Sequence, residues 1–123
     1  MNKILIVDDD SDSRKLLHDL LAFFQYEVAE APNGEEGIRM AAAWKPDLIL
    51  MDIQMPVMNG LTTIKVLKDN PSTRGIKIIA VTSFAMRSEQ EEIVRAGVDG
   101  YLAKPIHTRE LMELVRKIMG ERS

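Results

Sequence analysis

Short apolar runs alternate along the chain with longer segments in which apolar residues recur every three to four positions. Runs of about four to six residues rich in β-branched side chains are too short for helices and are typical of buried strands. They predict strands over residues 4–7, 27–31, 48–51, 76–81 and 100–103, of which the second has the weakest pattern. The longer segments have the spacing of helices with one apolar face.

A predicted helix follows each predicted strand. The first turns are expected near residues 11, 34, 60, 88 and 108. Asn33 with Glu36, and Ser88 with Glu91, have the spacing of a capping box, in which a side chain accepts a hydrogen bond from the first turn of a helix. The apolar face of the first helix is expected to comprise Leu16, Leu17, Leu20, Leu21 and Phe24.

Five strand-helix units in strict alternation predict an α/β fold, a (βα)5 doubly wound sandwich. Parallel strands require crossover connections, and helical crossovers cover both faces of the sheet. We expect one domain over residues 1–123, with an open five-stranded parallel sheet in the flavodoxin-like order 2-1-3-4-5. The Asn-Gly pairs at 33–34 and 59–60 could form hairpin turns instead, but neither lies between two runs of period-two alternation.

The composition is that of an ordinary globular protein, with 46% apolar residues and a net charge of −3. Charges of both signs are mixed, so direct nucleic-acid binding is not expected. The chain has no cysteine, which excludes disulfides and thiolate chemistry. No apolar run approaches the roughly 20 residues of a membrane span and no signal segment opens the chain, so we expect a cytoplasmic protein. His18 and His107 are expected to be ordinary surface residues.

Polar residues follow four of the five apolar runs, at the edge where parallel strands end and ligands bind. Asp8 and Asp9 close the first strand, Asp52 the third, Thr82 the fourth and Lys104 the fifth. In the order 2-1-3-4-5 the first and third strands are neighbours, so three carboxylates converge. Because converging carboxylates repel one another, a divalent cation would stabilise them. Ligands that are all oxygens favour Mg²⁺ or Mn²⁺.

Asp52 is the candidate nucleophile at this edge. A carboxylate beside a metal ion, an ammonium group and a hydroxyl can attack phosphorus and form an aspartyl phosphate. Lys104 would supply the ammonium group and Thr82 the hydroxyl. Each of these residues also has a structural alternative. Asp8 and Asp9 could cap the next helix, and Lys104 could be a solvated loop residue. Thr82 could occur at the end of a strand only because threonine favours β-structure.

In order and spacing, these residues resemble the receiver domains of two-component response regulators, the CheY-like superfamily. The resemblance covers essentially the whole chain, and it rests on the acidic pair after the first strand, Asp52, Gly60, Thr82 and Lys104-Pro105. It implies a phosphoacceptor switch with no independent substrate turnover. The phosphodonor would be a histidine kinase or a histidine phosphotransfer protein.

The resemblance also implies a metal site around the phosphoacceptor, Asp52. Asp8, Asp9, Asp52 and the backbone carbonyl of Gln54 would hold Mg²⁺. Asp10 matches a position that is often acidic but is not usually a direct ligand. We expect Asp10 to cap the following helix.

The remaining implied roles concern switching. Thr82 and Lys104 would bind the phosphoryl group, and Lys104-Pro105 would be a cis peptide. Tyr101 occupies the switch-aromatic position and would move with Thr82, although it could equally be a core residue. Phe84 could shield the acyl phosphate from water.

Unless it is cut from a longer protein, the chain is expected to act without an output domain of its own. Only residues 121–123 follow the predicted helix stop at Gly120, and only two residues separate Met1 from the first predicted strand. It would resemble single-domain regulators of cell polarity or motility. A downstream protein would then bind the face formed by the helix over residues 88–97, the last strand and the last helix.

Two other functions use the same residues. A Mg²⁺-dependent phosphohydrolase of the haloacid-dehalogenase type would also pass through an aspartyl phosphate, but it would have an acid where this chain has Gln54. A scaffold that binds its partner without phosphate would tolerate replacement of Asp52. A nucleotide-binding enzyme is not expected, since neither GxxxxGK[ST] nor GxGxxG occurs.

Overall fold

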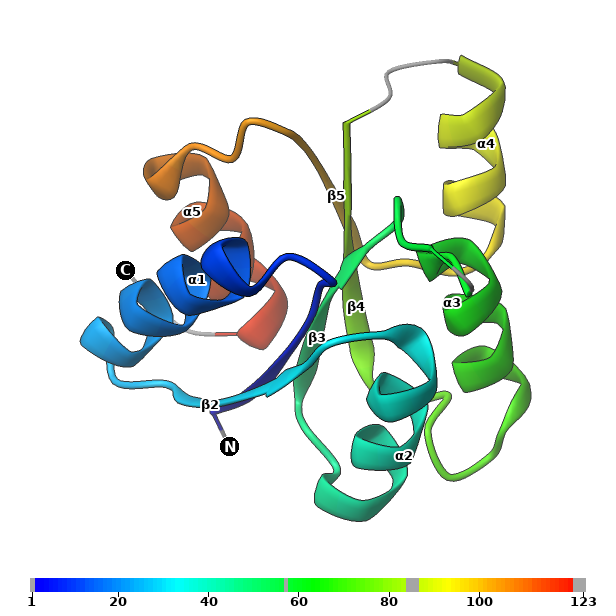
Figure 1. Ribbon diagram of the computed structural model, residues 1–123, viewed down its shortest axis with the longest axis horizontal. Helices are drawn as coiled ribbons and strands as arrows, with labels where there is room; N and C mark the ends of the chain where they lie inside the picture. Colours follow the sequence, from blue (N-terminus) through cyan, green and yellow to red (C-terminus); the bar gives the residue numbers. More distant parts are fainter. Residues whose placement is uncertain (1, 57, 84–86, 121–123) are drawn as a thin grey trace.

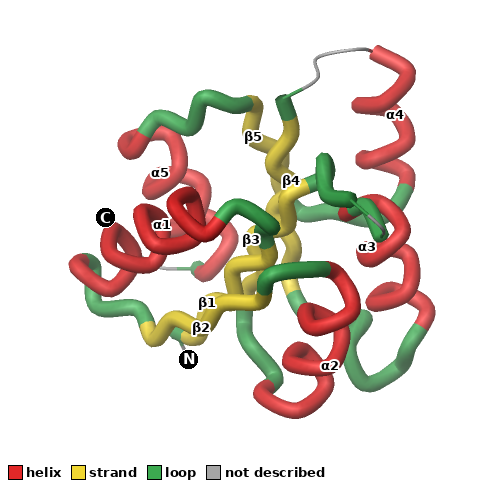
Figure 2. The backbone as a smooth tube through the Cα atoms, in the orientation of Figure 1, coloured by secondary structure: helices red, strands yellow, loops and turns green. Residues whose placement is uncertain are grey.

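The computed structural model of the protein describes residues 2–56, 58–83 and 87–120. In these residues five strands alternate with five helices (Figure 1 and Figure 2). The strands are β1 (Lys3–Val7), β2 (Glu27–Ala31), β3 (Leu48–Asp52), β4 (Lys77–Thr82) and β5 (Gly100–Ala103). The helices are α1 (Ser11–Phe23), α2 (Gly34–Trp44), α3 (Gly60–Asp69), α4 (Arg87–Arg95) and α5 (Thr108–Met119). None of these described helices is both long enough and apolar enough to cross a membrane.

The strands form one parallel sheet in the order β2-β1-β3-β4-β5. Helices α1 and α5 cover one face of the sheet, and α2, α3 and α4 cover the other (Figure 1). Asp52, the last residue of β3, lies opposite Val81 of β4. The predicted doubly wound fold and its strand order are therefore confirmed.

The alternation of side chains along each strand divides the core into two layers. Ile4 and Ile6 of β1 pack on the side of α1 and α5. Leu5 and Val7 pack on the side of α2, α3 and α4. Because both faces of the sheet are covered, the central strands have buried residues at almost every position, which explains their unbroken apolar runs.

The apolar face predicted for α1 is only partly correct. Leu17 and Leu21 are buried, but Leu16 is 72% exposed. Residues four apart lie one above the other on a helix, so Leu17 and Leu21 face the sheet together, and Leu16 is turned away by about 100°. Phe24, the C-cap residue, lies instead beneath the guanidinium group of Arg116 from α5.

Helix α4 has one buried residue, Ile93, fewer than any other helix that the structure describes. It begins at Arg87, so Ser88 lies inside the first turn. The predicted capping box of Ser88 and Glu91 is therefore wrong, because a capping residue must precede the helix. The pair Asn33 and Glu36 does form the predicted cap of α2, with the Asn33 side chain accepting from the Glu36 N–H at 2.8 Å.

Candidate functional site

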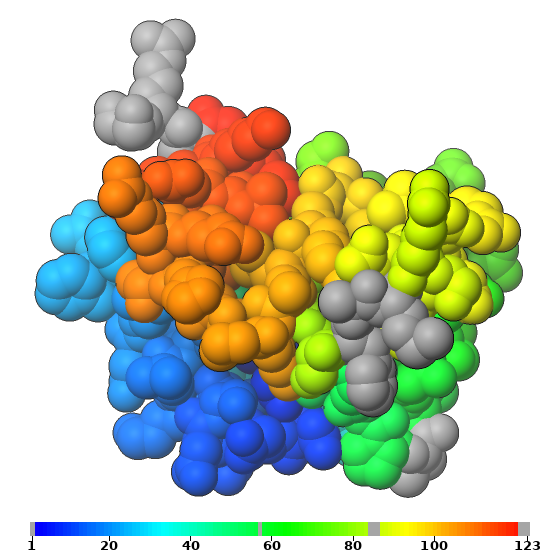
Figure 3. Space-filling view, turned by 90° about the horizontal axis from the view of Figure 1, so that it is seen from above, coloured from blue at the N-terminus to red at the C-terminus, as the bar shows by residue number. Residues whose placement is uncertain are grey.

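Three carboxylates meet at the carboxyl edge of the sheet, where β1 and β3 are neighbours. Asp8 and Asp9 follow β1, and Asp52 ends β3. One oxygen of each carboxylate lies within 4.8 Å of the others. Asp8 and Asp52 are buried and Asp9 is exposed. Seen from above, the segments that follow β1 (blue), β3 (green) and β5 (orange) adjoin one another on this face (Figure 3).

Burial makes the carboxyl group of Asp52 difficult to ionise. Loss of surrounding water raises its pKa to about 6, and the negative charge of Asp8 contributes to the rise. Lys104 opposes this effect, because its Nζ lies 3.4 Å from Asp52 Oδ1. The backbone N–H of Gln54 donates to the same oxygen at 3.2 Å. One ammonium group thus faces three carboxylates, and the site is short of positive charge.

The donor set fits a hard divalent cation, since all three converging side chains offer carboxylate oxygens. A cation would offset the loss of surrounding water and the repulsion by Asp8, which together raise the pKa of Asp52. Asp10 has a different role: its carboxylate caps α1 and accepts from the Asp12 N–H and the Ser13 hydroxyl. The bond from Ser13 is the main reason that the pKa of Asp10 is lowered. The prediction that Asp10 caps the helix is confirmed.

The loop that carries Asp8 is held by contacts that sequence patterns did not indicate. Arg14 of α1 donates from Nη1 to the backbone oxygen of Asp8 at 2.7 Å. Its Nε lies 3.2 Å from a carboxylate oxygen of Glu30 in β2, and Glu30 also contacts Nδ1 of His18 at 2.7 Å. His18, expected to be an ordinary surface residue, is therefore a half-exposed partner of Glu30. Only the packing of α1 against β2 brings these residues together.

Thr82, the last residue of β4, is buried, and its hydroxyl contacts the side chains of Glu89 and Gln54. It donates to Oε1 of Glu89 in α4 at 3.1 Å and accepts from the side-chain amide of Gln54. That amide also donates to Glu89 Oε1 at 3.3 Å, and its oxygen accepts from the Ser83 N–H at 2.7 Å. Gln54 was predicted only as a backbone ligand, and no sequence signal indicated its side chain or Glu89.

The segment after β5 brings Lys104 to the site. The Lys104 N–H donates to the backbone oxygen of Thr82 at 2.8 Å, and the Lys104-Pro105 peptide bond is cis. Tyr101 of β5 is half-buried and packs against the core on the side of α2, α3 and α4. Phe84, expected to shield the acyl phosphate, lies outside the described residues.

Gly60, the first residue of α3, lies against the backbone that carries Asp52. A Cβ at this position would lie 2.2 Å from the Asp52 carbonyl oxygen and 2.7 Å from Ile53 Cα. We expect Gly60→Ala to lower the free energy of unfolding by about 3 kcal/mol, because backbone atoms would have to move. Urea unfolding measures this change. Gly75→Ala is the control, since a Cβ there has nothing within 4 Å, and equal stability of the two variants would contradict the prediction.

The chain matches one family of known proteins over almost its whole length. The family model described as response regulator receiver domain matches residues 4–116. The polar-differentiation response regulator DivK of Brucella anthropi is 40% identical over 118 residues, which cover 96% of each chain.

Two solved structures with this fold are similar to the chain along nearly its whole length. The chemotaxis protein CheY4 of Vibrio cholerae has a TM-score of 0.90 and 28% identity, covering 96% of this chain and 98% of that chain. The receiver domain of the sensor histidine kinase PA1611 from Pseudomonas aeruginosa, solved with a magnesium ion coordinated in its active-site cleft, has a TM-score of 0.89 and 29% identity, covering 98% of each chain. The chain therefore belongs to the response regulator receiver domain family and acts in two-component signalling.

Proposed function

We propose that Asp52 accepts a phosphoryl group from a phosphohistidine of a histidine kinase or a histidine phosphotransfer protein, and that the acyl phosphate alters the protein-binding surface of the domain. One observation carries the proposal. The Asp52 carboxylate is buried 3.4 Å from the Lys104 ammonium group, with oxygens of Asp8 and Asp9 within 4.8 Å. A purely structural ion pair would be weakened by two further carboxylates beside it.

In the proposed transfer, a carboxylate oxygen of Asp52 attacks phosphorus and the bond from phosphorus to the imidazole nitrogen breaks. The bonding electron pair stays on that nitrogen, which takes up a proton from solvent. Lys104 and Thr82 would each donate to a phosphoryl oxygen, which stabilises the charge that the oxygens carry during transfer. With a pKa of about 6, Asp52 is mostly ionised at neutral pH and can act as the nucleophile.

We further propose that Mg²⁺ binds to Asp8, Asp9, Asp52 and the backbone carbonyl of Gln54, and that Mn²⁺ can replace it. When bound, the ion supplies positive charge to the phosphoryl oxygens. The support is the donor chemistry, since the converging side chains offer oxygens alone and carry more negative charge than Lys104 can neutralise. The magnesium ion in the PA1611 receiver domain is consistent with this proposal.

The altered surface would be the face formed by α4, β5 and α5, where we place a downstream protein. Thr82 ends β4, and Tyr101 lies opposite Ala80 of the same strand. A shift of Thr82 toward the phosphoryl group would therefore be passed to the strand that carries Tyr101. Val94 of α4 is 64% exposed and offers an apolar contact to such a partner.

We expect one phosphoryl group per chain rather than repeated turnover of a separate substrate. A phosphohydrolase of the haloacid-dehalogenase type would need an acid two residues after Asp52. That residue is Gln54, whose amide has no titratable proton and is bound to Thr82 and Ser83.

Intact mass after incubation with acetyl phosphate and Mg²⁺ tests the proposed function. We expect the wild-type protein to gain one phosphoryl group, and to gain none when EDTA replaces Mg²⁺. Asp52→Asn should gain none, whereas Asp69→Asn, which changes an exposed aspartate at the end of α3, should gain one. Uptake by Asp52→Asn, or no uptake by folded wild-type protein from either acetyl phosphate or a partner kinase, would contradict the proposal.

A further inference from the structure

We propose that Gln54 and Glu89 form a clasp on the Thr82 hydroxyl, that this clasp holds the first turn of α4 against the end of β4, and that a phosphoryl group on Asp52 opens it and releases α4. The opening step rests on the proposed function of Asp52. The closed clasp concerns the unphosphorylated protein and can be tested separately. Gln54 and Glu89 act through Thr82, so both are positioning residues.

The clasp joins three separate parts of the chain. Gln54 follows β3, Thr82 ends β4 and Glu89 lies in the first turn of α4. Each of the three side chains contacts the other two, through the bonds from Gln54 to Thr82, from Gln54 to Glu89 and from Thr82 to Glu89. The bond from the Ser83 N–H to Gln54 fixes the orientation of the amide. A buried hydroxyl and a carboxylate on a helix are thus tied to the strand edge that carries Asp52.

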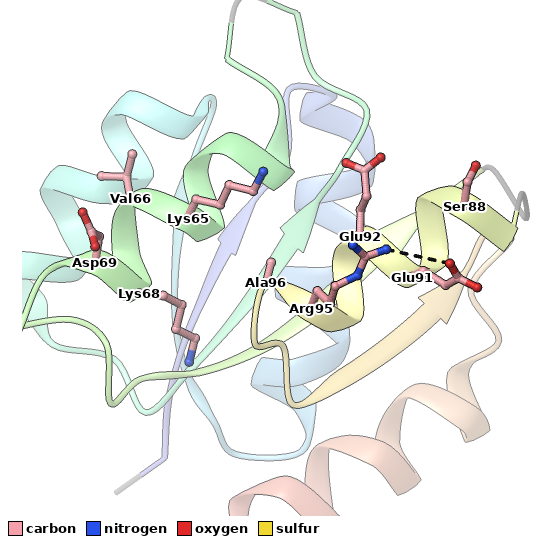
Figure 4. Close-up of a pocket in the computed structure, with 9 residues that line it drawn as sticks. All are labelled: Lys65, Val66, Lys68, Asp69, Ser88, Glu91, Glu92, Arg95 and Ala96. Carbon is pink, nitrogen blue, oxygen red and sulfur yellow. Dashed lines mark ion pairs between the residues drawn. The ribbon is translucent and has the colours of Figure 1, made fainter.

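Helix α4 has little apolar packing of its own to hold it there. Ile93 is its one buried residue. A cleft of about 830 Å³ separates α4 from α3, with Lys65 and Lys68 on the α3 side (Figure 4). The ion pair drawn in this cleft, between Arg95 and Glu91 at 3.8 Å, lies within α4 and does not cross to α3. Polar contacts at the first turn of α4 should therefore contribute strongly to its position.

The clasp and a phosphoryl group compete for the same proton. A threonine hydroxyl has one proton to donate. In the unphosphorylated protein that proton goes to Glu89, so Thr82 can donate to a phosphoryl oxygen only after the bond to Glu89 breaks. The Glu89 carboxylate would then face an anionic group with no hydrogen bond from Thr82, and repulsion would move it away. Phosphorylation would in this way remove the contact between α4 and the end of β4.

Amide hydrogen exchange in residues 87–95 tests the closed clasp in the unphosphorylated protein. We expect Glu89→Ala to speed exchange there by about tenfold, the effect of losing hydrogen bonds to one charged group. Glu92→Ala is the matched control, because Glu92 is an exposed glutamate one turn further along α4 and lines the cleft. Residues 87–95 of Glu92→Ala should exchange at the wild-type rate. Residues 108–119 should exchange at the same rate in all variants. Equal exchange in Glu89→Ala and Glu92→Ala would overturn the clasp.

A double-variant cycle separates the clasp from a general effect of charge at the start of the helix. Thr82→Ala removes the shared hydroxyl, so we expect the Thr82→Ala and Glu89→Ala double variant to exchange no faster in α4 than Glu89→Ala alone. Glu89→Gln keeps an oxygen that can accept from Thr82 and should exchange nearly like wild type. Additive effects of the two alanine substitutions would overturn the clasp.

The opening step is tested in wild-type protein treated with acetyl phosphate and Mg²⁺, with intact mass measured on the same sample. We expect phosphorylated protein to exchange in α4 as fast as unphosphorylated Glu89→Ala, and Glu89→Gln to respond less because it has no charge to repel. Phosphoryl uptake with unchanged exchange in α4 would overturn the opening step and leave the proposed function intact. No phosphoryl uptake, from either acetyl phosphate or a partner kinase, would overturn the proposed function together with the opening step. The closed clasp is judged separately, by the unphosphorylated variants.

Discussion

Lys104→Met is expected to slow phosphorylation of Asp52 by acetyl phosphate by about 10²- to 10³-fold, the usual effect of removing one fixed group that stabilises transition-state charge. Lys104 Nζ lies 3.4 Å from Asp52 Oδ1 and is the ammonium group of the site. Its loss has two consequences. A phosphoryl oxygen loses a charged donor, and the pKa of Asp52 rises further because the nearby positive charge that lowers it is gone.

The rate of phosphoryl uptake, followed by intact mass at saturating Mg²⁺, measures this effect. Lys65→Met, which changes an exposed lysine of α3, is the control and should react like wild type. Lys104→Arg should fall between the two, since a guanidinium keeps the charge but spreads it over a planar group. A Lys104→Met protein that is phosphorylated as fast as Lys65→Met would contradict the proposed role of Lys104.

Asp52→Asn is expected to raise the free energy of unfolding by about 3 kcal/mol at neutral pH when no divalent cation is present. This value is the free-energy cost of ionising the Asp52 carboxyl group at a pKa of about 6 instead of the ordinary 3.8. The amide has nearly the shape of the carboxyl group but needs no counter-charge. The wild-type protein must hold an ionised carboxylate in a buried site beside Asp8. The residue that we assign to phosphoryl transfer therefore destabilises the fold.

The pH dependence has a definite sign. Between 3.8 and about 6 the folded protein keeps a proton on Asp52 that the unfolded chain has lost, so the contribution of Asp52 to the free energy of unfolding falls as the pH rises through this range. The advantage of Asp52→Asn should therefore shrink as the pH is lowered from neutral toward 3.8.

Urea unfolding in EDTA at several pH values measures the stability difference. Asp69→Asn should stay within about 0.5 kcal/mol of wild type throughout, because that aspartate is exposed. Saturating Mg²⁺ should stabilise wild type more than Asp52→Asn, because a ligand of the folded state shifts its stability by mass action. A constant difference at all pH values would contradict the assigned cause, the buried charge of Asp52.

Sequence patterns were sufficient to predict the strands and the residues that close them. An apolar run such as 48–51 ends at the carboxyl edge of the sheet, so its end is visible as the change from Met51 to Asp52. In a parallel sheet all such ends lie on one edge, which is why Asp8, Asp9 and Asp52 could be expected to converge. These predictions depend only on local pattern and on the rules of parallel sheets.

Contacts between side chains of distant elements could not be predicted in this way. The bond between Thr82 and Glu89 depends on where α4 lies, and α4 has little apolar patterning to position it. The contact of Arg14 with Glu30 likewise depends on how α1 rotates against β2. The same rotation exposes Leu16, because a difference of one helical position decides whether a leucine faces the sheet or the solvent.

The most direct test of the central claim identifies the residue that carries the phosphoryl group. Borohydride reduces an acyl phosphate to an alcohol, so a phosphorylated aspartate becomes homoserine, which peptide mass spectrometry can locate. After treatment with acetyl phosphate and Mg²⁺, we predict homoserine at Asp52 and nowhere else in the chain. Homoserine at Asp8 or Asp9, or at no residue of a protein whose intact mass had increased by one phosphoryl group, would contradict the account.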